Sequence, residues 1–150
     1  MKRNAFTMIE LVFVIVVLGI LAAIAIPKLA ATRDDAQMAK GRSDVAAIRA
    51  AIVSERQTRL LQGDSSYISA LDGASGGIFD GNDSTHILLQ YGIAPGTGNG
   101  HWRKTNTNEY TFHVLNADTA FTYYPVINGT HQAGTFDCDH TTANCKSLTE

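Results

Sequence analysis

The chain is poor in cysteine, proline and charge. Its 150 residues include two cysteines and three prolines, and 17% are charged, below the usual quarter. Two cysteines exclude a dense disulfide scaffold. A net charge of −2 argues against a nucleic-acid binder. Polar side chains are missing altogether from the sixteen residues 11–26, so these averages combine two unlike regions.

Motifs of enzyme chemistry are also missing. The glycine-rich residues 96–100 lack the lysine and the preceding strand of a phosphate-binding loop. Residues 73–77 have the Gly-x-Ser-x-Gly spacing, but they lie within the glycine-rich segment expected to be loop and not at the strand-to-helix turn of a nucleophile elbow. The five histidines are scattered along the chain: His86, His101, His113, His131 and His140. We therefore expect neither enzymatic activity nor a bound cofactor.

The N-terminal region has the length of a membrane span. Residues 6–27 carry one charge, Glu10, and follow Lys2 and Arg3. As a helix they extend about 33 Å, enough to cross a hydrocarbon core of ~30 Å with the N-terminus inside. The segment fits a signal peptide with a small-x-small site at residues 23–25, a plain anchor, or a prepilin leader. Glu10 favours the third, because an acid inside a span costs ~2.5–3.5 kcal/mol unless it has a role or lies at the interface.

Residues 4–11, Asn-Ala-Phe-Thr-Met-Ile-Glu-Leu, begin a recognisable pattern. With the apolar residues that follow, they resemble the N-terminal signature of type IV pilins and type II secretion pseudopilins. In that family a short basic leader is removed and the new N-terminal amine is methylated. A glutamate follows at the fifth mature position, and the apolar helix contains a glycine and a proline. The corresponding positions here are Ala5, Phe6, Glu10, Gly19 and Pro27.

The resemblance implies a role for each of these residues. The chain would be cleaved between Ala5 and Phe6, and the Phe6 amine would be methylated. Glycine usually precedes the cleaved bond, and Ala5 is its smallest substitute, so we expect cleavage to be kept but slower. Glu10 would pair with the Phe6 amine of an adjacent subunit. Gly19 and Pro27 would kink the helix, since the proline ring removes a backbone hydrogen bond.

The helix is expected to continue through residues 28–62 and to end at the turn signal of residues 63–66. Its apolar stripe has three- and four-residue spacing: Met38, Gly41, Val45, Ile48, Ile52 and Leu60. The opposite face is predicted to carry Arg42, Arg49, Arg56 and Arg59. The net charge is +3 for residues 28–62 and −6 for residues 63–150. These basic side chains are either a solvated surface or contacts to acidic heads of neighbouring subunits.

Residues 63–105 contain nine glycines and are expected to be mostly loop. A short helix is predicted over residues 84–91, capped by Asp83. The expected anchors of this loop are Ile78, Phe79, Leu88, Leu89 and Trp102.

Strand patterns follow at residues 110–115, 120–126 and 130–136, with a turn at residues 116–118 and a hairpin signal at Asn128-Gly129. We expect an antiparallel meander of three or four strands whose one face buries the amphipathic helix. The predicted fold class is therefore α+β, with a long N-terminal helix packed on a small sheet, as the resemblance also implies.

Cys138 and Cys145 have two interpretations. The resemblance places them outside the cytoplasm, which favours a disulfide. With His140 and His131 they would instead make a zinc site. Calcium ligands are conceivable in two places, at Asp80, Asn82 and Asp83 or at Asp137 and Asp139. Asn82 also fits the acidic form of the bacterial N-glycosylation pattern, for which a turn and helix cap is the alternative.

The predicted organisation is a leader (1–5), a transmembrane and filament-core helix (6–27), an amphipathic helix (28–62) and a periplasmic head (63–150). The resemblance implies a structural subunit of a type IV pilus-like filament, most like a type II secretion pseudopilin. Its partners would be like subunits, membrane lipid, a prepilin peptidase and methyltransferase, and an inner-membrane assembly platform. The alternatives are a type IV pilin for adhesion, motility or DNA uptake, and a secreted soluble protein with a cleaved signal peptide.

Overall fold

The computed structural model describes residues 6–73, 76–82 and 85–150. The chain divides into two compact units, Met1–Ala36 and Gln37–Glu150, and the helix α1 (Met8–Leu61) contributes to both. The predicted leader with Ala5, and the predicted helix cap at Asp83 and Ser84, lie outside the described residues.

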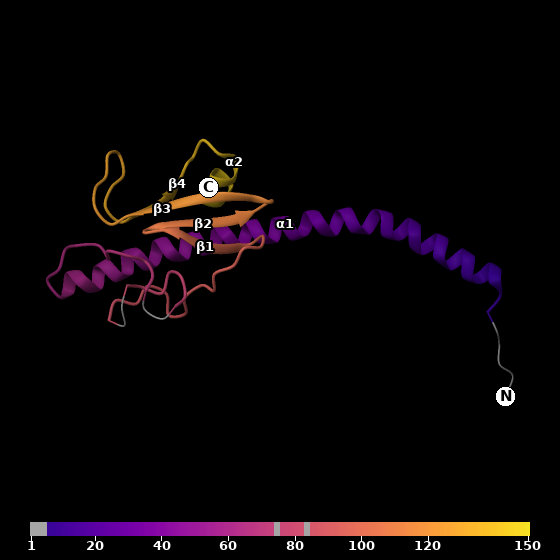
Figure 1. Cartoon of the computed structure of the whole chain (residues 1–150), viewed down its shortest axis with the longest axis horizontal. Helices are drawn as coiled ribbons and strands as arrows, with labels where there is room; N and C mark the ends of the chain where they lie inside the picture. The colour runs from indigo at the N-terminus through magenta and orange to yellow at the C-terminus, as the bar shows by residue number, and fades with distance from the viewer. Residues whose placement is uncertain (1–5, 74–75, 83–84) are drawn as a thin grey trace, which may run out of the picture. The chain divides into compact units, whose positions relative to one another are not determined.

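Helix α1 runs as a single helix of 54 residues, close to the predicted bounds (Figure 1). It continues through Gly19 and Pro27, so the kink at these positions stays a prediction. The helix ends at the predicted turn, because Gly63 adopts a φ of 87°. The Gly63 N–H donates to the Leu60 carbonyl (3.1 Å) and the Asp64 N–H donates to the Arg59 carbonyl (3.0 Å). These two bonds form a Schellman cap, which satisfies carbonyls at the helix end.

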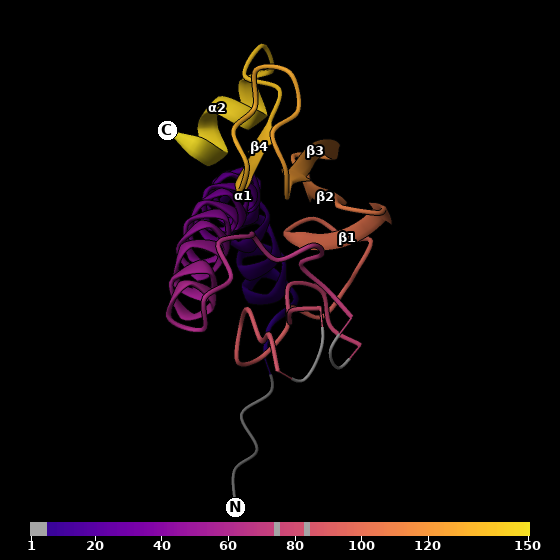
Figure 2. The same ribbon diagram turned by 90° about the vertical axis from the view of Figure 1, so that its left-hand side faces the viewer.

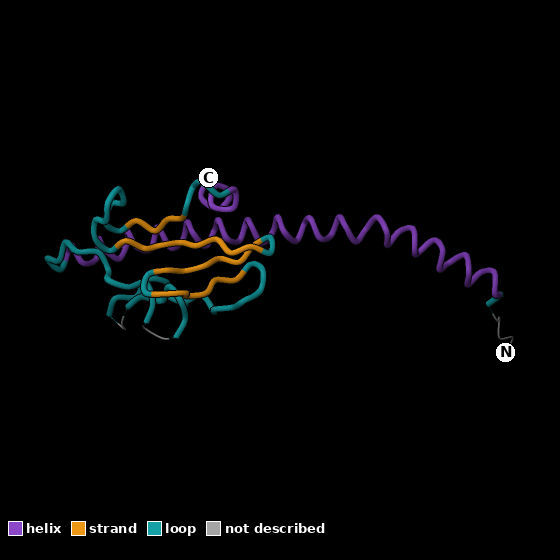
Figure 3. Tube along the Cα trace, turned by 45° about the horizontal axis from the view of Figure 1, so that its top comes forward, coloured by secondary structure: helices purple, strands orange, loops and turns teal. Residues whose placement is uncertain are grey.

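The second unit contains an antiparallel sheet of four strands in the order β1-β2-β3-β4 (Figure 3). The strands are β1 (His101–Asn106), β2 (Glu109–Val114), β3 (Ala117–Tyr124) and β4 (Thr135–Cys138). Each strand pairs with the next along the chain, and a short helix, α2 (Ala143–Thr149), follows β4. The predicted α+β class and the meander are therefore confirmed.

Several strand boundaries differ from the prediction. Strand β1 lies where a loop was expected, because Trp102 pairs with Phe112 and is completely buried. The turn lies at Leu115 and Asn116 and not at residues 116–118, so strand β3 begins at Ala117, three residues earlier than predicted, and ends at Tyr124. Strand β4 starts five residues later than predicted. The Asn128-Gly129 signal forms a small turn closed by a bridge between Asn128 and His131, within the loop that joins β3 to β4.

The helix predicted at residues 84–91 is absent from its described part, residues 85–91. Two backbone N–H groups there donate to carbonyls eight and ten residues earlier in the chain. Leu88 donates to the Asp80 carbonyl (3.2 Å) and Leu89 donates to the Phe79 carbonyl (3.1 Å). These hydrogen bonds join residues 88 and 89 to residues 79 and 80 of the same loop. The expected anchors Ile78, Phe79, Leu88 and Trp102 are buried, and Leu89 packs against them.

The core lies between one face of the sheet and the second half of α1, which run alongside each other (Figure 2). Val45, Ile48 and Ile52 of the predicted stripe are buried against the aromatic side chains of the sheet. Gly41 is needed there, since an added Cβ would lie 2.5 Å from the Phe112 ring and 2.6 Å from Leu148. Leu60 was wrongly assigned to the stripe and is 49% exposed. Glu55 and Arg59 continue the buried face in its place, as an ion pair (2.6 Å).

Candidate functional site

The first part of α1 presents apolar side chains on every side. All described residues from 6 to 29 are exposed, and exposure of the large apolar side chains ranges from 37% at Val17 to 85% at Met8. By length and composition, α1 is suited to cross a membrane. A helix that is apolar all round is stable when hydrocarbon or other apolar helices surround it. This segment therefore needs an apolar environment.

Thr7 and Glu10 form a capping box at the start of α1. The Thr7 N–H and hydroxyl both donate to Glu10 Oε2, at 2.8 and 2.7 Å. The Glu10 N–H donates back to the Thr7 hydroxyl (3.3 Å). These bonds satisfy N–H groups that the first helical turn leaves unpaired. The Thr-x-x-Glu spacing is a capping signal readable from the sequence, although no role was predicted for Thr7.

The capping box leaves Glu10 able to bind a cation as well. An ionised carboxylate has about four acceptor positions on two oxygens, and Thr7 donates to Oε2. The positive end of the helix dipole favours a negative charge at this position. Glu10 is held at the helix start, and a second donor such as a protonated amine is chemically compatible with that geometry. Phe6, the predicted methylated residue, directly precedes the box and is 83% exposed.

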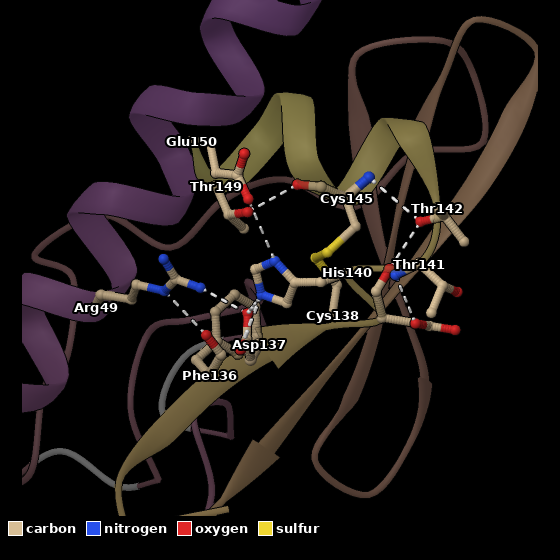
Figure 4. A network of polar contacts seen from close by, with 11 residues as sticks. Arg49, Phe136, Asp137, Cys138, His140, Thr141, Thr142, Cys145, Thr149 and Glu150 are labelled. Atoms are coloured by element: carbon tan, nitrogen blue, oxygen red, sulfur yellow. Dashed lines mark hydrogen bonds and ion pairs between the residues drawn. A yellow bond between two sulfur atoms is a disulfide. The ribbon is translucent and has the colours of Figure 1, made fainter.

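In the head, a polar network joins α1 to the end of the sheet (Figure 4). Arg49 of α1 donates from Nε to the Phe136 carbonyl (3.0 Å) and from Nη2 to Asp137 (2.8 Å). His140 Nε2 lies 3.1 Å from the same Asp137 oxygen. His140 Nδ1 lies 3.8 Å from the Glu150 carboxylate. The network ties α1, β4 and the C-terminal residues together.

Cys138 and Cys145 form the predicted disulfide, with their Cα atoms 5.8 Å apart. It connects the last residue of β4 to α2. Because both sulfurs are bonded to each other, the alternative zinc site that needed them as thiolates is overturned. Thr142 caps α2 by accepting from the Cys145 N–H (3.4 Å). Cys145 and Leu148 are buried, so the bond holds the apolar side of α2 on the core.

The four arginines predicted on the opposite face contact their own head. Arg49 reaches β4, and Arg42 donates to the Ser147 carbonyl of α2. Arg56 donates to the Tyr67 hydroxyl (2.6 Å), and Arg59 binds Glu55 and Asp64. The prediction that they form a separate face is wrong, because these long side chains curl around the edges of the buried stripe.

The other candidate ligands have partners within the chain. Asp80 is buried and accepts from the Gly73 N–H (3.0 Å). The Asn82 amide donates to the Ser69 hydroxyl (3.1 Å). Asp139 accepts from the Thr141 N–H (2.9 Å), and this bond lowers the pKa of the Asp139 carboxyl. Among the described residues, no three His, Cys, Asp or Glu side chains come close enough to hold a metal. Calcium binding and glycosylation of Asn82 stay predictions.

Comparison with known proteins bears on the N-terminal segment. Residues 1–26 match the model of the prokaryotic N-terminal methylation motif. The chain is 39% identical over 51 residues to type II secretion system core protein G of Pseudomonas aeruginosa, covering 34% of this chain and 36% of that protein. It is 45% identical over 51 residues to the type IV narrow pilus major component PilA5 of Thermus thermophilus, covering 34% of this chain and 44% of that protein.

The matched segment thus spans less than half the length of either relative. No solved structure matches the chain. The sequence likeness is confined to about a third of the chain, and the long helix with a four-stranded antiparallel sheet adds an α+β arrangement of the pilin kind. The resemblance to type IV pilin-like proteins that residues 4–11 predict is therefore confirmed, with the methylation motif at residues 1–26 as its clearest sign.

Proposed function

We propose that the chain is a structural subunit of a type IV pilus-like filament, most like a type II secretion pseudopilin. The observation that carries this proposal is the segment of residues 6–29. It exposes apolar side chains all round and begins with one carboxylate fixed by Thr7. A soluble enzyme or a soluble binding module has no use for such a segment, whereas a filament core built of parallel helices buries it.

The precursor would wait in the bacterial inner membrane with residues 6–27 in lipid and its head in the periplasm. Cleavage after Ala5 by a prepilin peptidase creates a positive amine on Phe6, which is then methylated. On the assembly platform the subunit leaves the lipid and packs against like subunits. A charge buried in an apolar core is costly unless an opposite charge meets it. Glu10 therefore binds the Phe6 amine of the neighbouring subunit and sets the register.

In a secretion system, growth of such a filament would push proteins through an outer-membrane channel. The similarity to the Thermus thermophilus pilus component supports a second candidate, a true type IV pilin. The disulfide near the C-terminus also fits a pilin. Neighbouring genes separate the two, since a secretin with a secretion ATPase indicates the first and a retraction ATPase the second. A secreted soluble protein is the alternative of another class.

The test replaces Glu10 in the full chain, expressed in cells that process prepilins. Glu10→Leu removes both the charge and the capping box. Glu10→Gln keeps a side chain that can cap but removes the charge. We expect both variants to insert and to lose residues 1–5, and both to yield at least tenfold fewer filaments than wild type, since an unmatched amine costs more than ~1.4 kcal/mol. Filaments are counted by electron microscopy of sheared material.

Asp35→Leu is the matched control. It removes the same charge from the same helix, outside the apolar segment and at an exposed position. It should assemble like wild type. Wild-type filament numbers with Glu10→Gln would refute the ion pair. Failure of Glu10→Leu alone would then assign Glu10 to capping and not to register.

A further inference from the structure

Leu115 stands where the backbone disfavours it. It begins the two-residue turn between β2 and β3, with φ values of 54° at Leu115 and 57° at Asn116. Such turns favour asparagine and glycine, and a bulky side chain at positive φ is strained. The Leu115 side chain is nevertheless 46% exposed, so a large part of its apolar surface is free to contact a partner. Strain that persists at an exposed position marks a candidate contact site.

An apolar groove lies elsewhere on the head, with a volume of about 530 Å³. Its apolar walls are formed by the segment after α1 and by the loop between β3 and β4: Tyr67, Pro125, Val126, Ile127 and Ala133. Val126 and Ile127 are 69% and 67% exposed. Arg56 closes one side, with its guanidinium 4.1 Å from the centre of the Tyr67 ring. The Arg56 Nε atom is buried without a hydrogen-bond partner.

The turn and the groove lie at opposite ends of the same strand. Leu115 comes just before β3 and Pro125 comes just after it, so eight strand residues, about 26 Å, separate them. Figure 1 shows the β2–β3 turn and the β3–β4 loop at the two ends of the sheet. A contact between two such different surfaces is heterologous. When the rotation that relates two contacting subunits does not close a ring, the same contact can repeat and build an open helical filament.

The two ends are also complementary in charge. The groove is lined by the cation Arg56 and, among its described lining residues, by no acid. The turn lies near Asp118, whose carboxylate is 44% exposed, and the stretch from 105 to 145 contains neither lysine nor arginine. Asp118 also contacts Arg103 and His113 of its own sheet. The His113 hydrogen bond, with Arg103 nearby, lowers the pKa of Asp118, so this carboxylate stays ionised at neutral pH.

We propose that Leu115 of one subunit inserts into the groove formed by Tyr67, Val126 and Ile127 of a second copy of this chain, with Asp118 facing Arg56. This contact rests on the proposed filament and adds a second, head-to-head connection to the packing of the apolar helices. Burial of the leucine offsets the strain of its turn. Because the same contact repeats from subunit to subunit, it orients all heads in the same direction along the filament.

The first test is site-specific crosslinking in filaments of the full chain. Leu115→Cys and Ile127→Cys are placed in one chain, whose own two cysteines are already bonded to each other. Mild oxidation should give a ladder of multimers on a non-reducing gel. Cells that co-express the two single variants should give dimers only. Leu115→Cys with Tyr91→Cys is the control pair, because Tyr91 is 83% exposed and lies outside the groove.

The outcomes separate this contact from the proposed function. Processed subunits that form filaments but give no ladder, or give the same ladder with the control pair, would overturn the contact and leave the filament standing. Dimers from Leu115→Cys alone would also overturn it, because they indicate a two-fold contact. If the wild-type chain formed no filaments at all, both proposals would fall.

The second test uses Leu115→Asn, which suits the turn better than leucine does. The thermal midpoint of the detergent-solubilised full chain should be unchanged or higher, while filament yield falls about tenfold because the buried leucine is lost. Wild-type filament yield with Leu115→Asn would overturn the contact. A lower thermal midpoint would do so too, since Leu115 would then serve its own fold.

Discussion

The two halves of α1 are helical for different reasons. From residue 6 to 29 every described residue is exposed. From Gly41 to Arg59 one side is buried against the sheet, and polar residues cover the other. The second half takes its stability from the head, while the first depends on lipid or on other subunits. Changes in the two halves should therefore have separable consequences.

The largest expected effect in the head comes from Trp102→Ala. Trp102 is fully buried against Phe79, Phe112 and Phe121, and its indole N–H donates to Asp44 (3.0 Å). Its loss should lower the free energy of unfolding of the head by about 3–5 kcal/mol, as measured by urea denaturation. Tyr91→Ala, at an exposed position, should change it by less than about 0.5 kcal/mol. Membrane insertion should be unaffected, and a loss of insertion would contradict the separation of the two halves.

The same substitution at one glycine in each half of α1 tests the difference between the two halves. Gly41→Ala places a Cβ against Phe112 and Leu148 and should cost the head about 1–3 kcal/mol. Gly19→Ala meets nothing within 4 Å and should leave the stability of the head unchanged, while it raises local helix propensity by up to about 1 kcal/mol. Thermal unfolding followed by near-ultraviolet circular dichroism distinguishes them. Equal effects of both substitutions would show that α1 behaves as one uniform helix.

The smallest expected effect is a dependence on alkaline pH that belongs to the head. Burial raises the pKa of the Tyr110 hydroxyl, and its hydrogen bond to Asp72 adds to the shift. Burial likewise raises the pKa of Tyr123, which donates to the Ile68 carbonyl (2.7 Å). The neutral forms are favoured in the folded state, so stability should be level below about pH 10 and fall above it.

Each tyrosine should contribute a slope of at most about 1.4 kcal/mol per pH unit above pH 10. Urea midpoints measured from pH 8 to 11.5 test this. Tyr123→Phe should flatten the decline, since the phenol that ionises in the unfolded chain is gone. A decline of unchanged steepness in both Tyr110→Phe and Tyr123→Phe would show that other groups cause it.

Sequence reasoning succeeded where one physical requirement dominates. The apolar run at residues 11–26 and the motif around Glu10 are recognisable from neighbouring residues alone. The three- and four-residue spacing of Val45, Ile48 and Ile52 correctly indicates a buried helix face. The helix stop at Gly63 was likewise predictable, because only a residue that tolerates positive φ ends a helix in this way.

The incorrect predictions concern residues whose structure is determined by partners distant in the sequence. Trp102 pairs with Phe112 across the sheet, and a window around residue 102 does not contain that information. Residues 85–91 have a helical pattern, but the N–H groups of Leu88 and Leu89 donate to the carbonyls of Asp80 and Phe79. The arginines of α1 were placed by helical geometry alone, which ignores how far a long side chain can reach toward β4 and α2. Thr7 was missed although its capping signal is local.

The most direct test of the central claim is the intact mass of the protein recovered from membranes of cells that contain a prepilin peptidase. The account predicts a chain that begins at Phe6, lacks residues 1–5 and carries one methyl group on its terminal amine. Ala5→Gly should give the same product at least as quickly. A mature chain that begins at Ile26, after an ordinary signal peptidase site, would contradict the account, because Glu10 and the apolar segment would then be absent from the working protein.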